Sequence, residues 1–160
     1  MRYPQVKTIN PSLNNAKLLV SAFYVGALII FGFLVDTPLE IIYGIQAIIT
    51  SPDTLITDYM GVGGIGAAFV NSGLLSLIVL IIFYGLELQI NGFAVACLFT
   101  VAGFALFGKN IFNVWFIVIG VFLYARYQGK QLSEVIYAAL FGTALAPLTT
   151  EILFSTTSSP

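Results

Sequence analysis

The sequence predicts an all-α integral membrane protein, a bundle of about five transmembrane helices with one short interfacial or re-entrant helix. Hydrophobic residues make up 59 % of the 160 residues, charged residues make up 8 %, and the mean hydropathy is +1.00. A soluble domain carries roughly 25 % charged residues, so the charges of this chain are too few to cover a solvated surface. The composition therefore excludes a soluble globular enzyme, and also a disordered chain, which needs low hydrophobicity and high charge.

The positions of the charged residues predict where the chain crosses the membrane. About 20 apolar residues cross a hydrocarbon core of roughly 30 Å, and long uncharged intervals such as that between Lys17 and Asp36 meet or approach this length. They lie in a transmembrane domain of residues 18–154, between an N-terminal tail of 1–17 and a polar tail of 155–160. The predicted transmembrane helices are 18–35, 65–86, 92–107, 110–125 and 135–150.

The first two apolar segments differ in length. The segment 18–35 is long for the apolar core of a signal peptide and has no small-residue cleavage pattern after it, so we expect it to remain as a helix. The segment 41–50 is too short to span, and it follows Thr37 and Pro38, a typical helix-start signal. We expect an interfacial or re-entrant helix here, with an ordinary helix buried against the bundle as the alternative.

Glycines precede the helix predicted at 65–86. Residues 61–66 (GVGGIG) match the G-x-G-x-x-G pattern, but the run that follows is apolar on all sides, so we expect no dinucleotide cofactor. Gly63, Gly64 and Gly66 instead predict a backbone hinge or a close helix contact, with a functional loop as the alternative. Asn71, inside this helix, predicts a hydrogen bond between helices or a polar pathway.

The segment 92–125 must turn, because one continuous helix would be about 51 Å long. Gly108, Lys109 and Asn110 mark the turn, and Asn113 follows. Both flanking helices are short, so Lys109 either enters the bundle or lies on an exposed hairpin and reaches the interface. Inside the bundle it would attract an anion or polar solute, or pair with Asp58 or Glu151.

The last predicted helix, 135–150, carries a row of small residues, Ala138, Gly142 and Ala146, and is interrupted by Pro147. A broken helix would leave Glu151 facing a cavity, as in transporters. Alternatively the helix ends near Ala146 and Glu151 is solvated.

The residue types limit the chemistry. The chain has no histidine, and its single cysteine, Cys97, lies in an apolar run, so we expect no metal site, no disulfide and no cofactor. No basic run suggests nucleic-acid binding, and no side-chain set resembles a catalytic constellation. We therefore expect a protein that is not an enzyme.

The basic residues predict the orientation. With the N-terminus in the cytoplasm, five spans leave Lys109 as the only basic residue outside. We therefore expect a multi-pass protein of the inner (plasma) membrane with a cytoplasmic N-terminus. The residues expected on the cytoplasmic side are Arg2, Lys7, Lys17, Arg126 and Lys130.

Several stretches between residues 50 and 155 resemble an uncharacterised family of bacterial multi-pass membrane proteins, a domain of unknown function. This resemblance implies a polytopic inner-membrane protein and supplies no activity. Because the members are longer, it implies that the chain is an N-terminal half or a truncated form. The stretches are 65–73 (IGAAFVNSG), 90–92 (ING), 99–104 (FTVAGF), 107–113 (FGKNIFN) and 141–147 (FGTALAP).

These features favour a membrane transporter or channel, or one half of one, for a small polar solute or anion. The predicted pathway consists of Asn71, Lys109, Asn110, Asn113 and Glu151, and the predicted backbone hinges are Gly63, Gly64, Gly66, Gly108 and Pro147. The alternative is a non-transporting subunit or assembly factor of a larger membrane complex. The expected partners are the lipid bilayer and either a second copy of the chain, a second half or a partner membrane subunit.

Overall fold

The computed structural model describes residues 11–51 and 57–154, and the described residues form helices, turns and short connections without a strand. The all-helical prediction is therefore confirmed. In chain order the elements are α1 (Pro11–Val35), α2 (Pro38–Thr50), α3 (Tyr59–Gly63), α4 (Ile65–Gly85), α5 (Gly92–Phe104), α6 (Val114–Tyr127), α7 (Leu132–Gly142), the 3-10 helix η1 (Thr143–Leu145) and α8 (Ala146–Phe154).

Within the part of the chain that the structure describes, three helical segments are long and apolar enough to cross a membrane: Pro11–Val35, Ile65–Gly85 and Leu132–Thr149. The predicted helices 92–107 and 110–125 correspond to α5 and α6, which have 13 and 14 residues. Each is roughly 20 Å long, which is less than the thickness of the hydrocarbon core. The count of five full spans is therefore not established. We call α5, α6 and the loop that joins them the α5–α6 hairpin.

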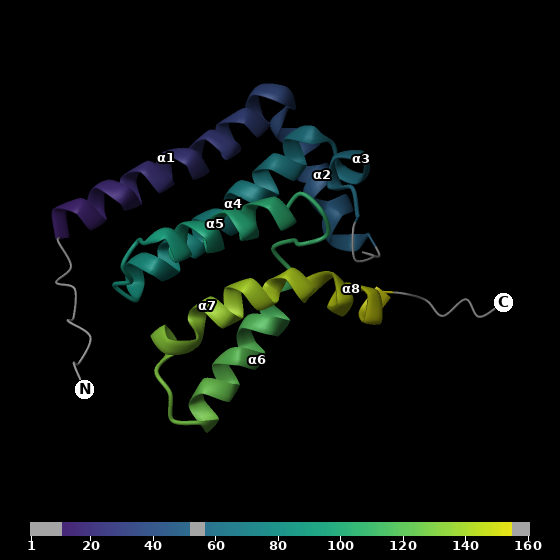
Figure 1. Ribbon diagram of the computed structural model, residues 1–160. Helices are drawn as coiled ribbons and strands as arrows, with labels where there is room; N and C mark the ends of the chain where they lie inside the picture. The colour runs from purple at the N-terminus through teal and green to yellow at the C-terminus, as the bar shows by residue number, and fades with distance from the viewer. Residues whose placement is uncertain (1–10, 52–56, 155–160) are drawn as a thin grey trace, which may run out of the picture.

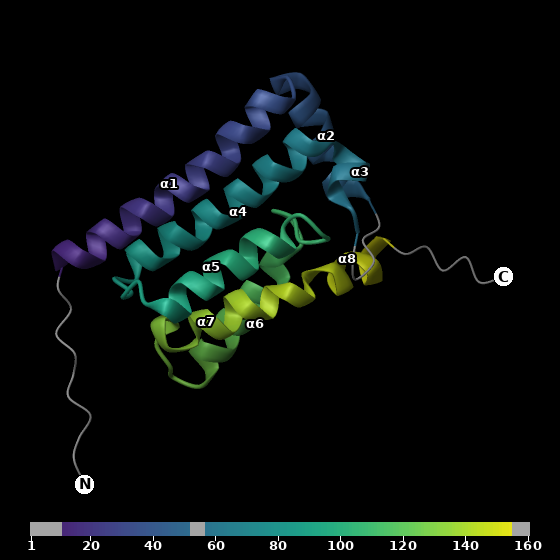
Figure 2. The same ribbon diagram turned by 45° about the horizontal axis from the view of Figure 1, so that its top comes forward.

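The helices run back and forth between two ends of the bundle (Figures 1 and 2). The start of α1, the α4–α5 connection and the α6–α7 connection lie at one end. The α1–α2 turn, α3, the α5–α6 loop and α8 lie at or toward the other end. Lys17 and Arg126 therefore belong to helices that begin or end at the first end, and Lys130 belongs to the α6–α7 connection there.

The first helix begins at Pro11, seven positions before the predicted boundary at residue 18. Proline is tolerated in the first turn of a helix, and polar residues such as Asn14 and Lys17 continue the helix beyond the apolar interval that predicted it. Most of α1 is exposed, including Leu19, Phe23 and Leu34, so its outer surface is apolar and is not covered by the rest of the chain.

A capping box starts α2, as the Thr37-Pro38 signal predicted. The Thr37 backbone N–H and hydroxyl donate to the Glu40 carboxylate at 2.8 and 2.7 Å, and both bonds lower the pKa of Glu40. One face of α2 is buried through Ile41 and Ile48, whereas Ile42 on the other face is exposed. The helix α2 is therefore half-buried. Its buried face fits the predicted helix packed against the bundle, and its exposed face fits the predicted interfacial helix.

Close backbone contacts join α1 to α4. A Cβ atom built on Gly32 would lie 2.6 Å from the carbonyl oxygen of Gly66, and one on Gly66 would lie 2.6 Å from that of Gly32. No larger side chain fits without moving the helices apart. Beside this contact, the Gly66 N–H donates to Asp36 Oδ2 at 2.7 Å. The glycine pattern thus serves close helix packing, one of its two predicted structural roles.

Gly63 is the last residue of α3, and Gly64, with a φ of +88°, lies between α3 and α4. The backbone therefore does break within the glycine pattern, as the hinge interpretation predicts.

We predict that Gly32→Ala destabilises the fold by about 1–3 kcal/mol, the usual cost of forcing extra atoms into a packed contact. Gly26 is the matched control because it lies in the same helix with nothing within 4 Å of a built Cβ. Thermal unfolding in detergent micelles, followed by circular dichroism, measures both variants. Equal stability of Gly32→Ala and Gly26→Ala would contradict the proposed contact.

Candidate functional site: the buried loop between α5 and α6

The α5–α6 loop, residues 105–113, turns the chain inside the bundle. The helix α5 ends at Phe104, and the Lys109 N–H donates to the Phe104 carbonyl at 3.1 Å. Gly108 has a φ of +103°, a conformation that other residues rarely adopt. The predicted turn at Gly108, Lys109 and Asn110 is therefore present, and these residues are buried rather than exposed.

Two asparagines close the turn. The Asn110 N–H donates to Asn113 Oδ1 at 2.9 Å, and the Asn113 N–H donates to Asn110 Oδ1 at 2.9 Å. Asn113 Nδ2 also donates to the Gly108 carbonyl at 2.8 Å. These side chains satisfy backbone groups that the interrupted helix leaves without intrahelical partners.

The helix α4 holds the loop from the other side. Asn71 Nδ2 donates to the carbonyls of Ala105 at 2.7 Å and Lys109 at 2.9 Å, and Ser72 Oγ donates to the Ala102 carbonyl at 2.8 Å. Asn71 is the seventh residue of α4, so the loop meets this helix about 9 Å from its first residue. The hairpin tip therefore lies below the end of the bundle.

Further contacts come from α3 and α8. Asn110 Nδ2 donates to the Tyr59 hydroxyl at 3.0 Å, and the Tyr59 N–H donates to the Leu106 carbonyl at 3.4 Å. On the opposite side, Thr149 Oγ1 lies 3.5 Å from the carbonyl oxygen of Asn113. Residues of α3, α4 and α8 thus all contact this loop.

Lys109 is the charged residue of this cluster. Its side chain is 0 % exposed, and its Nζ has no hydrogen-bond partner within residues 11–51 and 57–154. The nearest aromatic ring is that of Phe104, whose centroid lies 5.6 Å from Nζ. The interpretation of Lys109 as an exposed hairpin residue is therefore wrong, because the α4 side chains draw the loop into the interior.

Neither predicted carboxylate partner reaches Lys109 in the described structure. Asp58 caps α3 by accepting from the Met60 N–H at 3.0 Å, and Glu151 on α8 is exposed. A hollow of about 470 Å³ lies nearby, lined by Phe99, Thr100, Gly103, Phe104 and Phe107. Phe104 lines this hollow, and its ring centroid also lies 5.6 Å from the Lys109 ammonium nitrogen.

Pro147 interrupts the last helix, as predicted. It lacks the N–H that would bond to the Thr143 carbonyl, and α7 gives way to η1 just before it. The helix then resumes as α8 and continues to Phe154 instead of ending near Ala146. In the predicted row of small residues, Ala146 is buried but Ala138 is exposed, so the row is not one continuous contact.

Of the predicted pathway residues, Asn71, Lys109, Asn110 and Asn113 come together, whereas Glu151 does not. The predicted hinges are spread over the loop (Gly108), the α3–α4 junction and the start of α8. Sequence reasoning missed Tyr59, Ser72 and Thr149. Ser72 had one available signal, because it directly follows Asn71 in an otherwise apolar helix.

No group of histidine, cysteine or acidic side chains suited to a metal ion occurs among the described residues. The chemistry that the cluster offers is therefore that of a buried ammonium group surrounded by backbone and amide groups. Such a group attracts an anion or a polar solute with a partial negative charge.

A family model described as a protein of unknown function (DUF1576) matches residues 37–160. This match confirms the resemblance inferred from the sequence and extends it toward the N-terminus, from residue 50 to residue 37. No curated protein and no solved structure matches the chain.

We predict that Ser72→Ala destabilises the protein by about 1 kcal/mol, because it removes a buried hydrogen bond and leaves the Ala102 carbonyl with one acceptor site unfilled. Ser76 is the matched control. It lies one turn further along α4, it is equally buried, and its hydroxyl has no partner among the described residues. Chemical unfolding in micelles compares the two, and a larger loss for Ser76→Ala would contradict the anchoring role of Ser72.

Proposed function

Since the chain belongs to the DUF1576 family, which supplies no activity, we propose from its geometry that it is an integral membrane protein that passes a small anion or polar solute across the bilayer. In this proposal it acts as a transporter or channel, or as one half of one, and not as an enzyme. Lys109 recognises the solute, and the α5–α6 loop holds Lys109 in place.

The observation that carries the proposal is the burial of the Lys109 ammonium group without a partner among the described residues. Removing a charge from water costs several kcal/mol unless an opposite charge or good hydrogen bonds compensate. In a membrane interior, an ionisable residue of this kind is a functional-site candidate by default. An anion next to Nζ would supply an opposite charge, so the burial of this ammonium group favours anion binding.

The hairpin supports the same function. Transporters place their binding sites where discontinuous helices end inside the membrane, and here α5 ends and α6 begins on either side of the buried loop. The helix α6 begins at Val114, five residues after Lys109, and the N-terminus of a helix carries a partial positive charge that favours anions. The loop accepts hydrogen bonds from, or donates them to, the side-chain amides of Asn71, Asn110 and Asn113. We therefore assign these amides to holding the loop rather than to binding the solute.

The side chain of Phe104 contacts both the ammonium group and a hollow at the surface. It is 40 % exposed, it lines the hollow of about 470 Å³, and its ring centroid lies 5.6 Å from Lys109 Nζ. We propose that a solute approaches through this hollow, and that Glu151 lies outside the path.

The distribution of charge supports the inner membrane and a cytoplasmic N-terminus. Lys17, Arg126 and Lys130 belong to the end where α1 begins, whereas Asp36, Glu40 and Asp58 belong to the opposite end (Figure 1). Basic residues are enriched on the cytoplasmic side. The α4–α5 and α6–α7 connections lie on the same side of the membrane whether α5 and α6 both cross it or enter and return. In either case the chain comes back to the side from which α5 starts.

A non-transporting subunit or assembly factor is the second candidate function. The exposed apolar surface of α1, which includes Leu19, Phe23 and Ile30, favours it because a partner subunit could cover this surface as well as lipid does. Native mass spectrometry separates the two candidates. A stable heteromeric partner supports this second function, and a single chain or homo-oligomer supports transport.

We predict the orientation by cysteine labelling in a Cys97→Ser background, in intact cells with a membrane-impermeant maleimide. A cysteine at Gln128, in the α6–α7 connection, should be protected because it lies in the cytoplasm. A cysteine at Ser158 should be labelled, although this position lies outside the residues that the structure describes. Labelling at Gln128, or protection at Ser158 until the membrane is permeabilised, would contradict the orientation.

We predict that Lys109→Met lowers solute flux at least about tenfold, which corresponds to about 1.4 kcal/mol in the barrier. The same substitution should raise stability by about 1–4 kcal/mol, since apolar replacement of a buried charge is often stabilising. Flux is measured in proteoliposomes with chloride, nitrate, phosphate and formate as probes. Lys109→Arg keeps the charge and should retain more flux than Lys109→Met.

Lys130→Met is the control, because it removes an exposed lysine from the α6–α7 connection. It should leave both flux and stability near their original values. If Lys109→Met instead lowered stability and left the flux of every probe unchanged, Lys109 would have a structural role and the proposed pathway would be wrong.

A further inference from the structure

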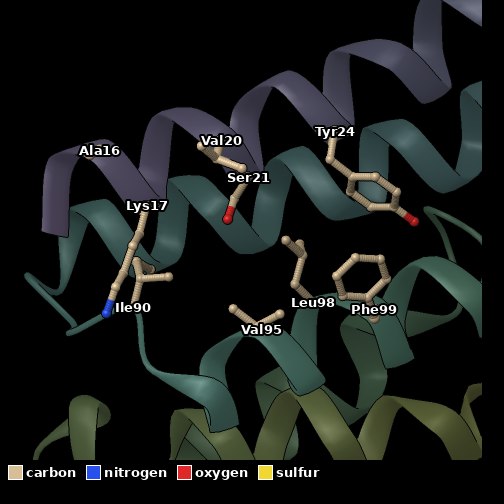
Figure 3. A pocket seen from close by; sticks show the side chains of 9 residues that line it. All are labelled: Ala16, Lys17, Val20, Ser21, Tyr24, Ile90, Val95, Leu98 and Phe99. Carbon is tan, nitrogen blue, oxygen red and sulfur yellow. The ribbon is translucent and has the colours of Figure 1, made fainter. Parts of the chain in front are cut away.

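A groove of about 330 Å³ lies between α1 and α5 (Figure 3). Both helices pack on α4, and side chains of α1 face those of α5 across the groove. The lining is apolar except for the Lys17 ammonium group, the Ser21 hydroxyl and the Tyr24 hydroxyl. The lining residues are Ala16, Lys17, Val20, Ser21, Tyr24, Ile90, Val95, Leu98 and Phe99.

Specific contacts bound the groove along its length. At one end the Ile90 N–H donates to Asn14 Oδ1 at 2.7 Å, which ties the start of α1 to the α4–α5 connection. At the other end the rings of Tyr24 and Phe99 meet with centroids 4.6 Å apart. The distance along α1 from Ala16 to Tyr24, the first and last lining residues of that helix, is about 12 Å, so the groove has the length of part of an acyl chain.

The single charge of this groove lies at one end. Figure 3 shows the Lys17 side chain pointing away from α1 toward Ile90, at the end opposite Tyr24 and Phe99. Glu87, in the α4–α5 connection, is an acidic residue at the same end of the bundle. It lines a different hollow, together with Pro11 and Asn15. The groove therefore combines an apolar channel with a positive charge at its mouth.

We propose that this groove binds an anionic phospholipid, with an acyl chain between α1 and α5 and the phosphate group beside Lys17. An apolar chain matches the lining, and the phosphate matches the ammonium group. This inference rests on the proposed membrane location and orientation, which place Lys17 in the cytoplasmic leaflet. Anionic lipids in that leaflet attract basic residues close to the membrane.

The experiment uses the whole chain in phosphatidylcholine vesicles that contain a trace of phosphatidylglycerol with a photoreactive diazirine on one acyl chain. After illumination, mass spectrometry locates the cross-linked peptides. We expect cross-links to residues 16–24 and 95–99, and we expect unlabelled phosphatidylglycerol to compete better than additional phosphatidylcholine.

Two pairs of variants test the two halves of the site. Lys17→Gln should weaken competition by phosphatidylglycerol about fivefold, whereas Lys130→Gln, which removes an exposed lysine at the same end of the bundle, should change it little. Ser21→Phe should fill the groove and reduce cross-linking. Ala22→Phe, on the adjacent exposed position of α1, should not reduce it.

Equal effects within either pair would overturn the proposal, as would cross-links spread evenly over the exposed face of α1. Circular dichroism of each variant checks that the helices remain, and a variant that unfolds is replaced by Val20→Phe, which fills the same groove. Solute flux is measured in the same vesicles. Normal flux with no localised cross-link refutes only the lipid site, whereas localised cross-linking without flux of any probe refutes only the transport proposal.

Discussion

Asn71 donates two hydrogen bonds to carbonyl groups of the α5–α6 loop, and the position of that loop depends on them. In an apolar environment each backbone polar group needs a partner within the protein, because no water replaces it. A turn can therefore lie inside this bundle only if other side chains satisfy its carbonyl and N–H groups. Asn71 satisfies the carbonyls of Ala105 and Lys109, while Asn110 and Asn113 satisfy the turn from within.

The helix α4 makes this arrangement possible because it packs closely against α1 on one side and forms hydrogen bonds with the α5–α6 hairpin on the other. On one side Gly66 brings the backbone of α1 into contact, and on the other side Asn71 and Ser72 bind the α5–α6 hairpin. Close approach and hydrogen bonding both act over short distances, so the two contacts fix α4 between its neighbours. The hairpin then places Lys109 in the interior. Burying its charge costs free energy, and binding of the proposed solute would offset that cost.

The sequence predicted much of this fold because the strongest signals were local. Low charge and long apolar intervals indicated a helical membrane protein, and Thr37-Pro38 marked the start of α2 where the structure places it. Gly108 and Pro147 marked two breaks in the helices for the same reason, since backbone conformation at glycine and proline depends little on distant residues. The start of α1 was wrong by several residues, because hydropathy measures the apolar interval and not the end of the helix.

What the sequence determined by itself was the set of polar residues that an apolar chain must accommodate, with Asn71, Lys109, Asn110 and Asn113 among them. It left open whether Lys109 points into the bundle or out of it, and it suggested carboxylate partners that the described structure does not bring to it. Only the tertiary structure decided these points. The reason is that the burial of Lys109 depends on Asn71, which lies 38 positions earlier in the chain, and hydrogen bonds over that separation leave no periodicity in the sequence.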